Sequence, residues 1–127
     1  AARYTNMALE ECDLLDFLEE TPPESFDLAA AVDVLVYFGN LSEIFRRTRT
    51  ILKSEGIFAY SVEADLESER DFRLRSTGRY CHTRRYLQEL ARQHGFAQVS
   101  FSQAVLREDK GVGVEGYICV LRRNASA

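Results

Sequence analysis

The sequence predicts an α/β fold in which a largely parallel sheet is covered by helices and ends in an antiparallel β-hairpin. Short apolar runs alternate with stretches of helical periodicity along the chain. The last two apolar runs, Phe96 to Leu106 and Val114 to Leu121, are separated only by residues 107–113, which is short enough for a hairpin. No repeat or shift of composition divides the 127 residues. We therefore expect one domain over residues 1–127 with no internal boundary.

The N-terminal third predicts a strand, a helix and a second strand. Met7 to Cys12 fits a short strand, and Asp13 begins a helix that reaches about Glu20. The dipeptide Pro22-Pro23 follows the helix and prevents its continuation. Phe26 to Val32 is nearly all apolar, which is typical of a parallel strand buried on both faces.

The middle of the chain predicts, in this order, a helix, a strand, a polar loop and a second helix. Asn40 caps the first helix, and Gly56 fits a left-handed stop at its end. Ile57 to Val62 is the next strand, and the charged residues of 63–78 indicate a surface loop. The second helix covers Thr83 to His94, and a glycine follows it.

The composition is that of a soluble globular protein with an acidic balance. The chain is 46% hydrophobic and 28% charged, and its net charge is −4. Nucleic acid is therefore not an expected partner. No apolar run approaches the roughly 20 residues that span a bilayer, and no signal peptide is recognisable. We expect a cytoplasmic protein that does not bind membranes.

The cysteines and histidines do not form a metal-binding pattern. Cys12, Cys81 and Cys119 are far apart and have no C-x-x-C spacing, which favours reduced thiols. The two histidines have no paired Cys or His at ligand spacing. We therefore expect no metal site.

Several segments follow one another in a pattern that belongs to a known family. Phe26 to Leu28 and then Ala31 to Tyr37 form one segment, and Arg49 to Gly56 forms the next. With the final antiparallel hairpin, they resemble the fourth strand and the following helix of class I S-adenosylmethionine-dependent methyltransferases. Glu11 to Leu14 is similar to the end of that family's third strand. Gly78 to His82 resembles a motif of a subgroup related to methyltransferases that carry tetratricopeptide repeats.

The resemblance implies a Rossmann-like methyltransferase sheet that is incomplete at its N-terminal half. The family's strand order is 3-2-1-4-5-7-6, and its first strand, glycine-rich cofactor loop and ribose-binding acid would precede residue 1. The chain also begins with Ala-Ala, so we expect a fragment that lacks this loop. Gly111 to Gly116 matches G-x-G-x-x-G, but a strand follows it where a nucleotide loop needs a helix, which indicates hairpin glycines.

The function implied by the resemblance is methyl transfer from S-adenosylmethionine to a small-molecule or protein acceptor that the sequence does not identify. The cofactor would be bound by the complete enzyme, and we do not expect tight binding or activity from these 127 residues alone. The alternative is a non-catalytic α/β interaction module, a half-domain that pairs with itself.

On the cofactor side, the resemblance implies two groups of residues. Asp13 and Leu14 would lie near the adenine, although Asp13 also fits an ordinary helix cap. Val32, Asp33 and Val34 would lie along the methionine and adenosine of the cofactor. The simpler interpretation of Asp33 is a loop carboxylate that accepts hydrogen bonds from backbone amides.

On the acceptor side, the candidates follow the fourth and fifth strands of the family pattern: Tyr37, Phe38, Glu63, Arg79, Tyr80 and His82. Tyr37 and Phe38 would shape the pocket where the methyl group meets its acceptor, unless they are core residues. Arg79 and Tyr80 suit an anionic or planar substrate. His82 is a candidate general base, although a surface histidine near a helix start is the interpretation that we favour.

The strand Phe26 to Val32 also predicts self-association. In the family order, a chain without the first two strands leaves one edge of this apolar strand unpaired. We therefore expect a homodimer through this edge, or its coverage by residues 1–12.

Overall fold

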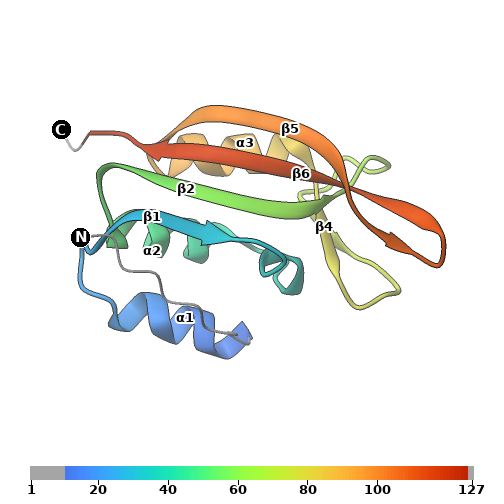
Figure 1. Ribbon diagram of the computed structural model, residues 1–127, viewed down its shortest axis with the longest axis horizontal. Coiled ribbons are helices and arrows are strands. Elements are labelled where there is room, and N and C mark those ends of the chain that lie inside the picture. The colour runs from blue at the N-terminus through green and yellow to red at the C-terminus, as the bar shows by residue number, and fades with distance from the viewer. Residues whose placement is uncertain (1–10, 126–127) are drawn as a thin grey trace.

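The computed structural model describes residues 11–125 and contains one mixed β-sheet with its helices packed against one face (Figure 1). The helices are α1 (Glu11–Glu20), η1 (Leu35–Tyr37, a 3-10 helix), α2 (Ser42–Ile51) and α3 (Arg84–Gln93). The strands are β1 (Phe26–Ala31), β2 (Leu52–Ala64), β3 (Phe72–Leu74), β4 (Tyr80–His82), β5 (Phe96–Asp109) and β6 (Val112–Arg123).

The long strand β2 organises the sheet. On one edge it pairs in parallel with β1 and, further along, with β4. On the other edge it pairs with β6 in antiparallel orientation, and β5 pairs with the far side of β6. The predicted α/β fold with a final antiparallel hairpin is therefore confirmed. The carboxyl ends of β1 and β2 point toward the end of the molecule where the β5–β6 hairpin projects (Figure 1).

The hairpin turn explains why a glycine occupies position 111. Asp109 pairs with Val112, so Lys110 and Gly111 are the only turn residues, with φ angles of 52° and 79°. A two-residue turn with both φ angles positive matches the twist of the strands and favours glycine. The interpretation of residues 111–116 as hairpin glycines is confirmed.

The covered face of the sheet carries an aromatic core. Phe45 of α2 meets the rings of Phe58 and Tyr60, each at 5.5 Å between centroids and close to edge-on. The residues that recur at helical spacing on the inner sides of both helices are buried: Leu41, Ile44, Phe45, Thr48, Ile51, Leu52, Tyr86, Leu87, Leu90 and Ala91. Helical periodicity thus located the face that packs on the sheet.

Two boundary predictions were wrong. Glu11 and Cys12 belong to α1 instead of a strand, and residues 7–10 lie outside the described residues. Helix α2 ends at Ile51, because the following residue already pairs with β1 as part of β2. The left-handed residue is Glu55, with φ 65°, and not Gly56, where a Cβ atom would lie 2.8 Å from the carbonyl oxygen of Lys53.

The predicted loop over residues 63–78 is more ordered than its charge indicates. It contains β3, which pairs with β4. Buried Asp65 accepts backbone hydrogen bonds from Glu67 and Ser68, both at 3.1 Å, and forms an ion pair with Arg73 at 3.3 Å. The charged residues therefore build the turn between two strands. None of the helices within residues 11–125 is long and apolar enough to cross a membrane.

Candidate functional site

A charged cavity of about 370 Å³ lies where the carboxyl ends of β1 and β2 meet the β5–β6 hairpin. This is the end of an open α/β sheet at which ligands bind. Its walls combine apolar and charged side chains from five parts of the chain: Val32, Asp33, Val36, Ala59, Tyr60, Ser61, Glu63, Arg79, Leu106, Arg107 and Ile118. We call it the charged cavity.

Asp33 occupies a strained position directly after β1. Its φ angle is 57°, a left-handed conformation that few residues other than glycine adopt. Its backbone N–H donates to Ser61 Oγ at 3.3 Å, and its carboxylate accepts from Arg79 Nη1 at 2.9 Å. The structure thus partners the carboxylate with a guanidinium from residue 79. The neighbouring Val32 is 71% exposed and lines the same cavity.

Glu63 is the buried carboxylate of the charged cavity. Its side chain is only 2% exposed and lies among three guanidinium groups. Oε2 is 3.1 Å from Arg107 Nη2 and 3.5 Å from Arg79 Nη1, and Oε1 is 3.6 Å from Arg75 Nε. A buried carboxylate is stable only with such compensation.

Arg79 links the two carboxylates to an aromatic ring. Its guanidinium lies 5.7 Å from the centre of the Tyr37 ring, a cation–π arrangement. Burial is the largest single influence and lowers the pKa of Arg79, but the hydrogen bond to Asp33 and the charges of Asp33, Tyr37 and Glu63 together raise it above its usual value. Arg79 therefore carries a permanent positive charge in the cavity, and the ring beside it, that of Tyr37, is 44% exposed.

His82 does not line the charged cavity and is fully buried, so the favoured interpretation as a surface histidine was wrong. Its Nε2 lies 2.9 Å from the carbonyl oxygen of Phe38 and 3.1 Å from that of Gly39, which places the proton on Nε2. Burial lowers its pKa, so the ring is neutral at pH 7. These contacts fasten the loop after η1 to β4. They offer no support for a general base, and that role stays a prediction.

The other predicted site residues are dispersed. Leu14 and Val34 line a different, apolar cavity, and Phe38 is buried in the core. The Tyr80 ring packs 6.0 Å from that of Phe72. Asp13 lies in α1, and its cofactor role stays a prediction. Of the predicted residues, the structure therefore brings together Val32, Asp33, Glu63 and Arg79 around the charged cavity, with Tyr37 beside Arg79.

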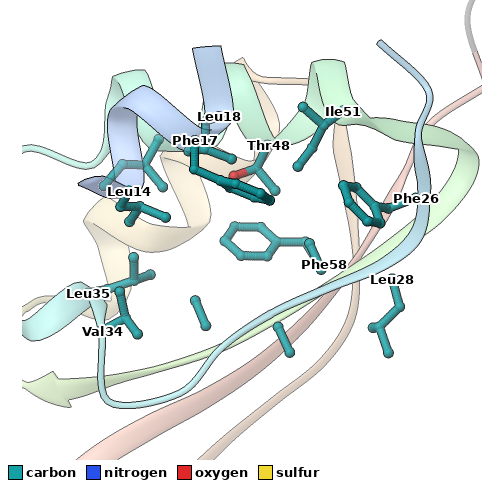
Figure 2. Close-up of a pocket in the computed structure, with 14 residues that line it drawn as sticks. Leu14, Phe17, Leu18, Phe26, Leu28, Val34, Leu35, Thr48, Ile51 and Phe58 are labelled. Atoms are coloured by element: carbon teal, nitrogen blue, oxygen red, sulfur yellow. The ribbon is translucent and has the colours of Figure 1, made fainter. Parts of the chain in front are cut away.

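The apolar cavity lies between α1, α2 and β1 and has a volume of about 200 Å³. Figure 2 shows Phe17, Phe26 and Phe58 around it, with Thr48 contributing the one labelled hydroxyl. Without converging polar groups it has no means of orienting a reacting molecule. We therefore place the candidate site in the charged cavity.

Two functional candidates were missed in the sequence. Arg107 belongs to β5 and Arg75 to the turn after β3, and both reach Glu63 across the fold. Arg107 begins a charged stretch directly after the predicted strand, so nothing in the sequence distinguished it from a solvated turn residue. Within residues 11–125, no group of three or more Asp, Glu, His or Cys side chains is arranged to hold a metal ion.

Comparison with known proteins identifies the fold. No protein-family model matches the sequence, and neither does any curated protein sequence. A crystal structure of an S-adenosylmethionine-dependent methyltransferase from Methanosarcina mazei matches 84% of this chain with a TM-score of 0.69 and 15% identity. The 1,6-didemethyltoxoflavin-N1-methyltransferase of Burkholderia thailandensis, with bound S-adenosylhomocysteine, matches 84% with a TM-score of 0.65 and 21% identity.

The chain thus has the fold of class I S-adenosylmethionine-dependent methyltransferases. It covers 63% of the M. mazei protein and 48% of the B. thailandensis protein. A [4+2]-cyclase, SpnF, matches 84% of this chain as well, with a TM-score of 0.65, 16% identity and 53% of its own length covered. Because a cyclase has the same fold, the fold by itself does not specify the reaction.

Proposed function

We propose that the protein is the acceptor-side part of an S-adenosylmethionine-dependent methyltransferase domain, and that the methyl acceptor binds at the charged cavity. The observation that carries the proposal is the placement of strained Asp33 and buried Glu63 together at the carboxyl ends of β1 and β2. Strain and buried charge at this end of an α/β sheet are typical of a functional site.

The residues of this chain would bind and orient the acceptor. The bound cofactor would supply a methyl group on a sulfonium, whose transfer leaves a neutral thioether. Asp33 and Val32 border the cavity on its β1 side, where they suit contact with the cofactor. Arg79, held by Asp33 and Glu63, and Tyr37 define the rim from which an acceptor would approach. Alignment of the two reactants and exclusion of water are the main contributions of such a site.

The finer assignments belong to the same proposal. Some assignments rest on the resemblance alone. These are the adenine side for Asp13 and Leu14, the cofactor side for Val34, and the acceptor side for Phe38 and Tyr80. The relation to the subgroup with tetratricopeptide repeats has the same basis. The proposed location is the cytoplasm, without nucleic acid or membrane partners. The strand and glycine-rich loop with which this family holds the cofactor have no counterpart within residues 11–125. We therefore propose that this chain supplies only part of the cofactor site.

Calorimetric titration with S-adenosylhomocysteine tests this function. Two aspartates at opposite ends of the same β1 segment provide a matched pair: Asp33 is in the charged cavity, and Asp27 forms an exposed ion pair with Lys53 at 3.8 Å. We expect weak binding that Asp33→Asn reduces and Asp27→Asn leaves unchanged. Equal effects of the two substitutions would contradict the proposed site.

The second candidate function is self-association through β1. Within the described residues, the edge of β1 that faces away from β2 pairs with no strand. On this strand Leu28 is 52% exposed, and Val32 just beyond it is 71% exposed. An open apolar edge favours pairing with a second copy of the chain. If sedimentation equilibrium shows a monomer at two protein concentrations that differ 100-fold, this homodimer is excluded.

A further inference from the structure

We infer that Arg79 and Arg107 form an oxyanion subsite, which takes a carboxylate or phosphate group on an otherwise apolar or planar methyl acceptor. The inference deepens the proposed function and rests on it for the identity of the ligand as an acceptor. The binding chemistry itself depends only on the side chains of the charged cavity.

The first support is the excess of positive charge around Glu63. Three guanidinium groups, those of Arg75, Arg79 and Arg107, lie within 4 Å of this one carboxylate. Among the side chains that the structure describes, the only other carboxylate within that distance of any of them is that of Asp33, which pairs with Arg79. Three positive charges therefore face two negative ones, in a chain whose net charge is −4. An additional anion would complete the balance.

The second support is the loose geometry of the arginine contacts. Charge-assisted pairs are commonly bidentate, with N–O distances of about 2.7 to 2.9 Å. Here each arginine approaches Glu63 through a single nitrogen, at 3.1, 3.5 and 3.6 Å. If the three arginines served only to neutralise Glu63, one tight bidentate pair would be sufficient. Each of the two arginines that line the cavity donates hydrogen bonds to carboxylates through one nitrogen only, Nη1 of Arg79 and Nη2 of Arg107.

Arg107 has the most unused hydrogen-bonding capacity. Its one hydrogen bond within the described residues goes from Nη2 to Glu63, and its buried Nε has no partner there. The side chain is still 34% exposed and lines the cavity together with Arg79. Glu63 is thus a positioning residue, which holds two planar guanidinium groups beside one space. Such groups suit the two oxygens of a carboxylate or phosphate.

The walls of the cavity define the rest of the ligand. Besides the charged groups, they contain five aliphatic side chains: Val32, Val36, Ala59, Leu106 and Ile118. A volume of about 370 Å³ accepts a molecule of the size of a substituted aromatic ring. Ligands with an apolar body and one anionic group therefore fit, whereas an ammonium group would meet two guanidinium groups.

The test uses three ring compounds of similar size: benzoate, phenyl phosphate and the neutral benzamide. We expect NMR titrations of the 127-residue chain to show at least about tenfold tighter binding of one of the two anions than of benzamide, with shifts at Arg79 Nε, Arg107 Nε and the Ile118 methyl groups. A preference for benzoate assigns a carboxylate, and a preference for phenyl phosphate assigns a phosphate. Equal binding of all three compounds, or no binding, would overturn the inference.

Substitutions of single arginines show which side chains bind the anion. Arg107→Gln should weaken anion binding at least about tenfold, whereas Arg92→Gln, which alters an exposed pair with Glu89 on α3, should have no effect. If Arg107→Gln does not fold, Arg107→Lys keeps the charge but removes the planar fork, and should weaken binding several-fold. Titration with S-adenosylhomocysteine is scored separately: anion binding without any cofactor response would leave the subsite standing and refute methyl transfer.

Discussion

The two faces of the sheet differ in how deeply their side chains are buried and in where their charged groups lie. The face covered by α2 and α3 holds Phe58, Tyr60 and Leu121, each no more than 2% exposed. The opposite face leaves Leu28 and Ile118 52% and 41% exposed, and places Glu63 and its arginines at one end. The covered face therefore supplies most of the stability, and the open face presents the groups that recognise other molecules.

The largest expected effect on the free energy of unfolding comes from an alanine substitution on the covered face, and a substitution on the open face provides the comparison. Phe58→Ala should lower the free energy of unfolding by about 3–5 kcal/mol, because it removes a ring from the centre of the aromatic core. Ile118→Ala should lower it by about 1 kcal/mol or less, since Ile118 is already 41% exposed. Urea denaturation measures both values. Similar losses at the two positions would contradict the division between the faces.

The charged cavity is the exception on the open face. Glu63→Gln should destabilise the fold by about 2–3 kcal/mol, because it leaves three guanidinium groups without their buried counter-charge. Asp27→Asn, at an exposed ion pair, should change stability by less than about 0.5 kcal/mol. The same denaturation experiment compares them, and a neutral Glu63→Gln would mean that the arginines do not depend on this carboxylate.

Acid should weaken the fold through His82. Burial lowers its pKa below the ordinary 6.5, so the unfolded chain binds the proton more readily. The contribution of this histidine to stability is present above pH 6.5 and is lost as the pH falls below that value, at most about 1.4 kcal/mol per pH unit. Denaturation midpoints between pH 7 and 5 measure the slope.

His82→Gln should reduce this slope, because the amide can still donate to Phe38 but does not titrate. His94→Gln, at the other histidine of the chain, is the variant whose pH dependence of stability is compared with that of His82→Gln. Burial also lowers the pKa of His94, which is less buried and has Ser42 Oγ 3.0 Å from Nε2. An unchanged slope in His82→Gln would place the acid sensitivity elsewhere.

The smallest effect on stability is expected at the sheet edges. Leu28→Lys on β1 and Val99→Lys on β5 replace residues that are 52% and 54% exposed, and each should change stability by about 0.5 kcal/mol or less. If the proposed homodimer forms through β1, Leu28→Lys alone should dissociate it. Sedimentation equilibrium distinguishes the two variants, and dissociation by Val99→Lys would assign the interface to β5.

The sequence predicted local structure better than contacts across the fold. The inward faces of α2 and α3 and the final hairpin follow from periodicity and turn residues, which are local properties. The extent of β2 was not predictable, because Leu52 leaves the helical pattern to pair with Phe26.

The candidate site shows the same difference. The positions of Asp33 and Glu63 at strand ends were predicted, but Arg107 reaches Glu63 from 44 residues away. The burial of His82 depends on the carbonyl groups of Phe38 and Gly39, which only the folded loop brings near it. Long-range pairing of this kind leaves no periodic signal in a single sequence.

Chemical-shift mapping with S-adenosylhomocysteine tests the central claim most directly. The account predicts weak binding, with a dissociation constant of about 1 mM, because this chain offers only part of the cofactor site. The largest shifts should fall on the backbone amides of Val32, Asp33 and Ser61, which line the charged cavity. No response at saturating millimolar ligand, or shifts confined to the apolar cavity around Phe58, would contradict the account.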